Sequence, residues 1–178
     1  MQKWIALLRG VNVGGKNILP MKDLRALLEG LGHREVKTYI QSGNCVFASA
    51  VTNRTALQAG LAAAIEKSFG FRPAVLVLTA EDMKAAIDRN PFGERVNDPK
   101  NLHLHFLIQE GTEACDLATL QDYATADEEF QLIDGVFYFY APNGMGRSKA
   151  ADKITRFLPV EMTARNLNSA RKILDLAT

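Results

Sequence analysis

Residues 9–17, with the sequence RGVNVGGKN, combine the groups best suited to hold an anion. Glycine accepts positive φ and allows the backbone to approach a ligand closely, so main-chain N–H groups can line a concavity. Arg9 and Lys16 add positive charge near the two ends of the segment. The segment therefore predicts a binding loop for a phosphate or a carboxylate, and it indicates no particular reaction.

The segment from Gly10 to Lys16 also fits the pattern G-x-x-x-x-G-K of nucleotide-hydrolysing P-loops. Asn17 follows the lysine, where that motif needs Ser or Thr to hold magnesium. The next helix is expected only near Pro20, and the hairpin expected after it is antiparallel, whereas P-loop folds use parallel strands. We therefore expect either a simple anion-binding loop or a structural turn without a ligand.

Three further polar segments lie at expected turns and strand ends, where binding residues are common. Residues 41–44 form a turn whose amides and hydroxyl could bind a ligand or serve the turn alone. Residues 143–149 place two cations at a helix start, which is unfavourable unless an anion lies nearby. Residues 163–166 end the last strand in a similar way. The candidate ligand-binding residues are Arg9, Asn12, Gly14, Gly15, Lys16, Gln41, Ser42, Asn44, Arg147, Ser148, Lys149, Arg165 and Asn166.

His103 and His105 alternate along one expected strand and so share a face, as two metal ligands would. No third ligand has a suitable spacing, so we expect a hydrogen-bonded or exposed histidine pair and no metal site. His33, after Gly32, is expected at the surface. The chain has no G-x-S-x-G, no H-E-x-x-H and no paired-cysteine zinc motif, and no base is evident beside Ser42 or Ser148. The sequence therefore predicts no catalytic residue or cofactor and does not decide whether the protein is an enzyme.

The first half of the chain is expected to form the elements that position these residues. An apolar strand at 4–8 precedes the glycine-rich loop, and a helix runs from Pro20 until Gly32 caps it. Strands at 36–40 and 45–48 flank the turn as a hairpin. A helix ending at Gly70 and a buried strand at 74–78 complete the order β-α-β-β-α-β, which is the ferredoxin-like arrangement.

The second half repeats this order of elements without any repeat at the level of residues. The expected elements are a helix from Thr79 that ends before Asn90, a strand at 102–108, a helix at 112–123, strands at 130–133 and 136–140, a helix capped by Ser148, a strand at 160–164 and a helix from Asn166. Residues 137–140 are aromatic and alternate faces, so one face should pack on another element. We predict an α+β fold with two ferredoxin-like subdomains in tandem plus a C-terminal helix: residues 1–79, a connecting helix and linker at 80–101, and residues 102–178.

The composition of the chain narrows the cellular compartment and the classes of binding partner that we expect. The 178 residues carry a net charge of +1, and residues 110–140 hold eight acids and no Lys or Arg. The sequence pI of about 7.8 is below the value of about 9 expected of a nucleic-acid-binding domain. No apolar segment approaches the roughly 18 residues of a membrane span. We expect a cytoplasmic protein with free cysteines at Cys45 and Cys115 and without a membrane partner.

Residues 7–17, residues 38–44, Arg147-Ser148-Lys149 and residues 163–166 together resemble an uncharacterised bacterial family, domain of unknown function 1697. The family pattern commonly has tryptophan after Arg-Asn, where this chain has Leu167. The resemblance implies an α+β fold with ferredoxin-like elements, and it supplies no activity, cofactor or catalytic residue.

These observations lead to three alternative hypotheses about the function. The leading hypothesis is binding of a phosphate- or carboxylate-bearing small molecule or nucleotide through the glycine-rich loop, with the other polar segments joining the same site. The alternative is an RNA-binding module, for which the third strand offers only Phe47 as a stacking aromatic. The remaining alternative is a structural or protein-interaction domain without a ligand. The sequence indicates no oligomeric state.

Overall fold

The computed structural model describes residues 1–109 and 111–178, and its internal contacts divide the chain into two units. Unit 1 comprises Met1–Ala85 and Arg171–Thr178, and unit 2 comprises Ala86–Ala170. The chain is mixed α and β, as predicted, with two four-stranded antiparallel sheets. Within the described residues, no helix is both long and apolar enough to cross a membrane.

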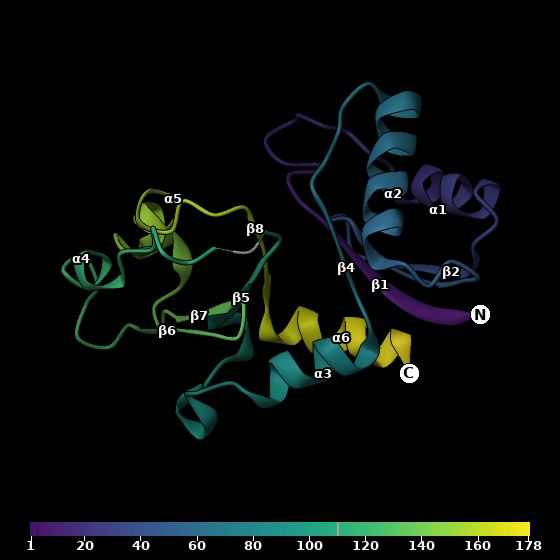
Figure 1. Cartoon of the computed structure of the whole chain (residues 1–178). Helices are drawn as coiled ribbons and strands as arrows, with labels where there is room; N and C mark the ends of the chain where they lie inside the picture. Colours follow the sequence, from purple (N-terminus) through teal and green to yellow (C-terminus); the bar gives the residue numbers. More distant parts are fainter. Residues whose placement is uncertain (110) are drawn as a thin grey trace. The chain divides into compact units, whose positions relative to one another are not determined.

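Unit 1 contains a sheet in the order β2-β3-β1-β4, with every neighbouring pair antiparallel. The helices α1 and α2 lie on one face of this sheet (Figure 1). The elements are β1 (Gln2–Leu8), α1 (Met21–Gly30), β2 (Arg34–Tyr39), β3 (Asn44–Ser49), α2 (Arg54–Phe69), β4 (Val75–Leu78) and the first part of α3 (Ala80–Asp88), whose last residues belong to unit 2. The loop at 9–20 and the turn at 40–43 therefore follow β1 and β2, and the pairing of Leu7 with Asn44 brings them to the same end of the sheet.

The helix boundaries of unit 1 follow local capping chemistry. Asn53 precedes α2 and its side chain accepts a hydrogen bond from the Ala56 N–H at 2.9 Å. Gly70 ends α2 in a left-handed conformation at φ +79°. Thr79 and Asp82 exchange backbone-to-side-chain hydrogen bonds of 2.9 and 3.1 Å at the start of α3, so the sequence prediction of a helix start there is confirmed.

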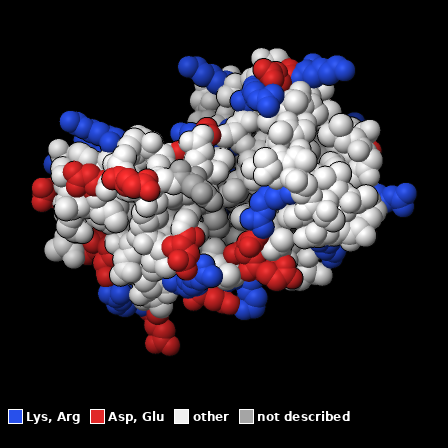
Figure 2. All heavy atoms as spheres, viewed as in Figure 1, with Lys and Arg blue, Asp and Glu red and all other residues white. Residues whose placement is uncertain are grey.

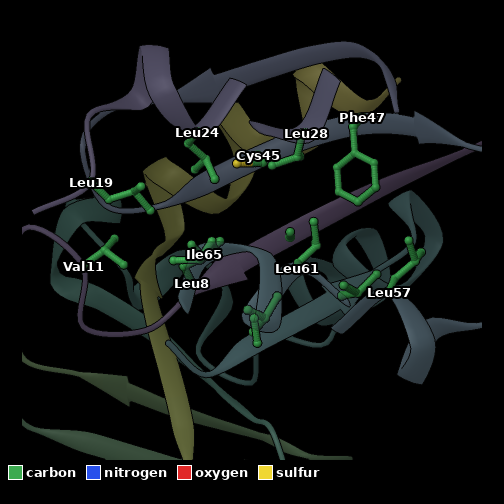
Figure 3. Packing of buried hydrophobic residues seen from close by; sticks show 14 of the residues in the cluster. Leu8, Val11, Leu19, Leu24, Leu28, Cys45, Phe47, Leu57, Leu61 and Ile65 are labelled. Carbon is green, nitrogen blue, oxygen red and sulfur yellow. The ribbon is translucent and has the colours of Figure 1, made fainter. Parts of the chain in front are cut away.

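The core of unit 1 lies between the sheet and the two helices (Figure 3). Its helices contribute leucines and Ile65 at spacings of three and four, and the strands contribute alternate residues such as Cys45 and Phe47. Val11 and Leu19, from the loop after β1, are buried in the same cluster and lie at one end of it in Figure 3. The glycine-rich loop is thus anchored to the core on both sides. Cys45 and Cys115 are free thiols, as expected, although Cys115 is only half-buried.

Strand β2 is an edge of the unit 1 sheet and is interrupted. Its register against β3 shifts between Arg34 and Lys37, and Glu35 within this bulge has φ +53°. Such a bulge bends and twists the strand locally.

Unit 2 contains a sheet in the order β6-β7-β5-β8, again with every neighbouring pair antiparallel. Its elements are β5 (Leu102–Leu107), α4 (Leu117–Gln121), β6 (Glu129–Ile133), β7 (Val136–Tyr140), α5 (Ile154–Phe157), β8 (Met162–Asn166) and the start of α6 (Leu167–Ala177). Short 3-10 turns lie at Gly93–Arg95, Pro99–Asn101, Met145–Arg147 and Ala151–Lys153.

The predicted helix at 112–123 is wrong in length, because α4 spans only five residues. Asp116 accepts a hydrogen bond from the Thr119 N–H at 2.9 Å, so the helix starts there and not at Thr112. The helix expected after Ser148 is a 3-10 turn followed by the single turn α5. The helices that cover this sheet are therefore much shorter than α1 and α2.

Both faces of β7 are buried. Phe137 and Phe139 belong to the cluster beneath α4 and α5, and they contact Phe130 with ring centroids 5.6 Å apart. On the other face, the Tyr138 hydroxyl donates a 2.7 Å hydrogen bond to the carbonyl of Ala86 in α3. The prediction that one face of this aromatic strand packs on another element is confirmed.

Candidate functional site

The glycine-rich loop is closed by its own hydrogen bonds. Its residues with positive φ are Gly10, Asn12, Gly14, Gly15 and Asn17. The Lys16 N–H donates to the Val13 carbonyl at 3.0 Å, and the Asn12 N–H donates to the Asn17 carbonyl at 3.1 Å. The Asn17 side chain donates to the Gly10 carbonyl at 3.0 Å. These hydrogen bonds give the loop a defined shape of its own.

Asn12 joins this loop to the turn that follows β2. Its Nδ2 donates to the carbonyl of Leu19 and to the carbonyl of Gln41, both at 2.8 Å. Its Oδ1 accepts from the Leu19 N–H, also at 2.8 Å. One side chain thereby fixes two segments that are 29 positions apart in the sequence. The structure thus brings together the first two groups of candidate residues, at 9–16 and at 41–44.

Gly43 lets the two segments approach closely. The Leu8 N–H donates to the Gly43 carbonyl at 2.9 Å. A Cβ atom on Gly43 would lie 2.7 Å from both Leu8 Cβ and Val11 Cγ2, which is closer than carbon atoms tolerate. Because Gly43 also has φ +73°, this position requires glycine for two reasons.

The exposed groups of this site are backbone amides and polar or cationic side chains. Gly14, Gly15, Lys16, Gln41 and Ser42 are all exposed, as is Arg9. Within residues 1–109 and 111–178, the N–H groups of Gly14 and Gly15 donate to no protein acceptor, and no carboxylate pairs with Lys16. These donors form a surface suited to an oxyanion.

The side chain of Asn44 is buried and stabilises the hairpin, so it is not available at the surface. Only 1% of its surface is exposed, and its Nδ2 donates to the Tyr39 carbonyl at 3.0 Å, across the base of the hairpin. Its side chain holds the turn at 40–43 in place, so its contribution to a site on this loop is indirect.

The remaining candidates belong to unit 2. Ser148 is buried, and its Oγ accepts from the Ala151 N–H at 2.9 Å, while Arg147 and Lys149 on either side are exposed. Arg165 is 8% exposed and donates to Thr163 Oγ1 at 2.9 Å and to the Ala164 carbonyl at 2.7 Å. Asn166 caps α6, because its Oδ1 accepts from the Ser169 N–H at 2.8 Å.

The histidines of β5 differ from the sequence prediction, since neither is hydrogen-bonded among the described residues, His105 is buried and His103 is half-buried. His105 is 8% exposed, and its ring lies 5.6 Å from that of Phe137 and 6.4 Å from that of His103. Among the described residues, His103 Nδ1 and His105 Nε2 are buried without a hydrogen-bond partner. Burial lowers the pKa of both, and that of His105 falls to about 3, with the charge of His103 as a second cause. Both rings are therefore neutral at pH 7.

The reason is that β5 is buried on both faces. Leu102, Leu104 and Phe106 alternate with the histidines and are themselves fully buried. No group of three or more His, Cys, Asp or Glu side chains among the described residues could hold a metal ion. His33 was also predicted wrongly, because it is buried with its ring 4.8 Å from that of Phe47.

The comparisons with known proteins agree with this fold. The structure described as conserved bacterial protein SP0830 from Streptococcus pneumoniae is similar, with a TM-score of 0.74 and 26% sequence identity over 99% of this chain and 98% of that one. No curated protein matches the chain. Residues 1–138 match the family described as protein of unknown function (DUF1697). The chain therefore belongs to the DUF1697 family, as its loop, turn and basic motifs predicted.

Proposed function

We propose that the protein binds a phosphate- or carboxylate-bearing small molecule or nucleotide at the glycine-rich loop and the turn after β2. The observation that carries this proposal is the double hydrogen bond from Asn12 Nδ2, which holds the loop beside Gln41. A loop that served only to connect β1 with α1 would not need a link to a second turn. The hydrogen bonds of Asn12 instead hold donors from both segments close together.

The charge of the surface fits an anion. Residues 9–17 carry two cations, Arg9 and Lys16, and no carboxylate, and the turn at 40–44 carries no acid. The exposed N–H groups of Gly14 and Gly15 lie between Arg9 and Lys16 in the sequence. Successive amides in left-handed and turn conformations are a common oxyanion-binding arrangement. Asn17 still stands where a P-loop needs Ser or Thr, so the proposal is binding and not nucleotide hydrolysis.

RNA binding has less support. Phe47, the only stacking aromatic expected on β3, is fully buried in the core of unit 1. Bases need an exposed aromatic face to stack on. On the face of the molecule drawn in Figure 2, basic and acidic side chains are interspersed and form no broad basic surface.

We also propose that both units are ferredoxin-like. The strand orders β4-β1-β3-β2 and β8-β5-β7-β6 are equivalent, and each sheet is entirely antiparallel. The element order β-α-β-β-α-β in each unit supports this assignment. Arg147, Ser148, Lys149, Arg165 and Asn166 remain candidate ligand residues of the second unit.

The test is titration of the protein with inorganic phosphate, followed by the amide NMR signals of Gly14 and Gly15. We expect these signals to shift saturably, and Lys16→Ala to weaken the affinity about five- to tenfold through loss of one charge-assisted contact. Lys67→Ala, on the exposed surface of α2, is the matched control and should leave the affinity unchanged. Absence of any shift at Gly14 and Gly15, with phosphate or with a carboxylate, would overturn the proposal.

A further inference from the structure

Two buried nitrogen atoms of unit 2, His103 Nδ1 and His105 Nε2, have no hydrogen-bond partner among the described residues. Buried polar atoms in native proteins nearly always have a partner, because leaving one unpaired destabilises the fold. Here both unpaired atoms belong to neighbouring rings of one strand, and an apolar side chain at either position would avoid that cost. The pair therefore points to a group that both nitrogens could bind.

The two rings lie at a spacing that suits one shared metal ion. His103 and His105 are two positions apart on β5, so both project from the same face of the sheet. Their ring centres are 6.4 Å apart. A ring nitrogen lies about 1.1 Å from the centre of its ring and about 2.0 Å from a bound metal ion, so two imidazoles on opposite sides of one ion have centres about 6.2 Å apart. Rotation of the rings where they stand is therefore enough to direct both nitrogens at one ion.

The surroundings of the pair limit the charge of that ion. The residues that face the two histidines from β7 and β8 are all uncharged: Phe137, Phe139, Ala164 and Asn166. Phe137 and Phe139 also belong to the apolar cluster beneath α4 and α5. A buried divalent ion without a carboxylate would keep two uncompensated charges, whereas a monovalent ion keeps one.

The number of ligands selects the metal further. Structural Zn²⁺ takes four ligands, and the described part of the chain holds no group of three or more His, Cys, Asp or Glu side chains for one. A cuprous ion is monovalent and soft, accepts imidazole nitrogen and is satisfied by two ligands on a straight line. Burial lowers the pKa of both rings, so both are unprotonated at pH 7, as metal ligands must be.

We propose that His103 and His105 form a two-coordinate site for a cuprous ion, with Nδ1 of the first and Nε2 of the second as ligands. The lack of a third ligand at a suitable spacing is no obstacle, because this coordination needs only two. The site is independent of the proposed function, since the pair lies in unit 2 and the glycine-rich loop in unit 1.

The experiment titrates the full chain, without oxygen, against Cu⁺ held by the coloured chelator bicinchoninate. Cys115 is changed to serine throughout, because its half-buried thiol is itself a ligand for Cu⁺. We expect one ion to be taken up per chain. His105→Leu should weaken the affinity at least about a hundredfold, which is the upper range for residues that merely orient a metal ligand. His33→Leu, at the buried histidine of unit 1, is the matched control and should leave the affinity unchanged.

A second measurement keeps all three histidines and does not depend on whether a variant folds. In NMR spectra of the protein with one equivalent of Cu⁺, the ring signals of His103 and His105 should shift while those of His33 stay in place. X-ray absorption of the same sample should show two nitrogen neighbours and the edge shape of a linear cuprous ion.

The remaining outcomes each overturn the site. Failure of the Cys115→Ser protein to take up Cu⁺ would show that the two nitrogens hold no such ion, and it would leave the proposed function untouched. Equal shifts at His33, or uptake that His105→Leu does not weaken, would mean adventitious binding elsewhere. Three or four neighbours around the copper, or Zn²⁺ bound as tightly at the same rings, would contradict a two-coordinate cuprous site.

Discussion

The two sheets have equivalent strand orders, yet their central strands bury different chemistry. In unit 1, the face of β1 that meets α1 and α2 carries Trp4, Ala6 and Leu8. In unit 2, the corresponding face of β5 carries His103 and His105 beside Phe137 and Phe139. The helices over unit 1 have ten and sixteen residues, whereas α4 and α5 have five and four.

This difference shows two ways of placing polar groups on one topology. Unit 1 places the polar residues of its loop and turn at the end of the sheet, where glycine and asparagine shape both segments. Unit 2 keeps two imidazoles within the sheet beneath short helices, where His103 Nδ1 and His105 Nε2 are buried without a hydrogen-bond partner among the described residues. A buried polar group without a partner costs about 1–3 kcal/mol, so unit 2 has given up stability that unit 1 has kept.

The largest effect is expected at the junction of loop and turn in unit 1. Gly43→Ala should destabilise the protein by about 2–4 kcal/mol, because it combines overpacking against Leu8 and Val11 with an unfavourable φ. Gly15→Ala, at the same φ of +73° but with open space around it, should cost only about 1 kcal/mol. Urea denaturation followed by the fluorescence of the single tryptophan, Trp4, measures both. Equal losses for the two variants would show that the loop and the turn are not closely packed.

The next effect is acid sensitivity of unit 2. The pKa of His105 is about 3 in the folded protein, so the ring stays neutral there, while the unfolded chain takes up a proton below pH 6.5. The contribution of His105 to the free energy of unfolding is therefore fully present above pH 6.5 and is lost as the pH drops toward 3. At pH 5 this loss lowers the free energy of unfolding by about 2 kcal/mol. The lowered pKa of His103 acts in the same direction.

The measurement is amide hydrogen exchange of β5 at pH 7 and pH 5, corrected for intrinsic exchange rates, with β1 as the internal comparison. His105→Leu should remove most of the additional opening of β5 at pH 5. If β5 of this variant still opens as much at pH 5 as in the unchanged protein, groups other than His105 cause the acid sensitivity. Earlier opening of β1 than of β5 would reverse the comparison between the sheets.

The smallest effect concerns the second face of β7. Tyr138→Phe leaves the Ala86 carbonyl without its 2.7 Å hydrogen bond and should destabilise unit 2 by about 1 kcal/mol. Tyr123→Phe is the control, because Tyr123 is 36% exposed and contacts Phe157 through its ring, which this substitution keeps. Thermal unfolding of the two variants should differ by a few degrees. No difference would mean that the Ala86 carbonyl finds another donor.

The sequence predicted the elements of unit 1 well because its signals are local. Asn53, Gly70 and the Thr79–Asp82 pair act within one helical turn, and their capping bonds appear as expected. The helix predicted at 112–123 was overpredicted mainly at its start, because the Asp116 side chain caps the helix only just before Leu117. Burial of His105 depends on neighbours from β7 and β8, which no local pattern contains.

The site was predicted to a similar degree. The glycine-rich loop and the turn at 41–44 were singled out as candidates from their composition. Their connection was not, because Asn12 reaches a backbone carbonyl 29 positions away, and an asparagine has no local signature for such a bond. The exposure of Ile18 and Ile40 was also missed, since only a structure shows that these side chains are excluded from the core that holds Leu19.

The bulge in β2 has a consequence for how copies of this protein behave at high concentration. An edge strand with regular, unpaired backbone groups is a template on which another chain can add a strand. Here the left-handed backbone of Glu35 breaks that regularity between two cations, Arg34 and Lys37, on a strand that is otherwise half open to solvent. The interrupted edge therefore disfavours pairing with a strand of another chain, although β2 remains an exposed edge strand.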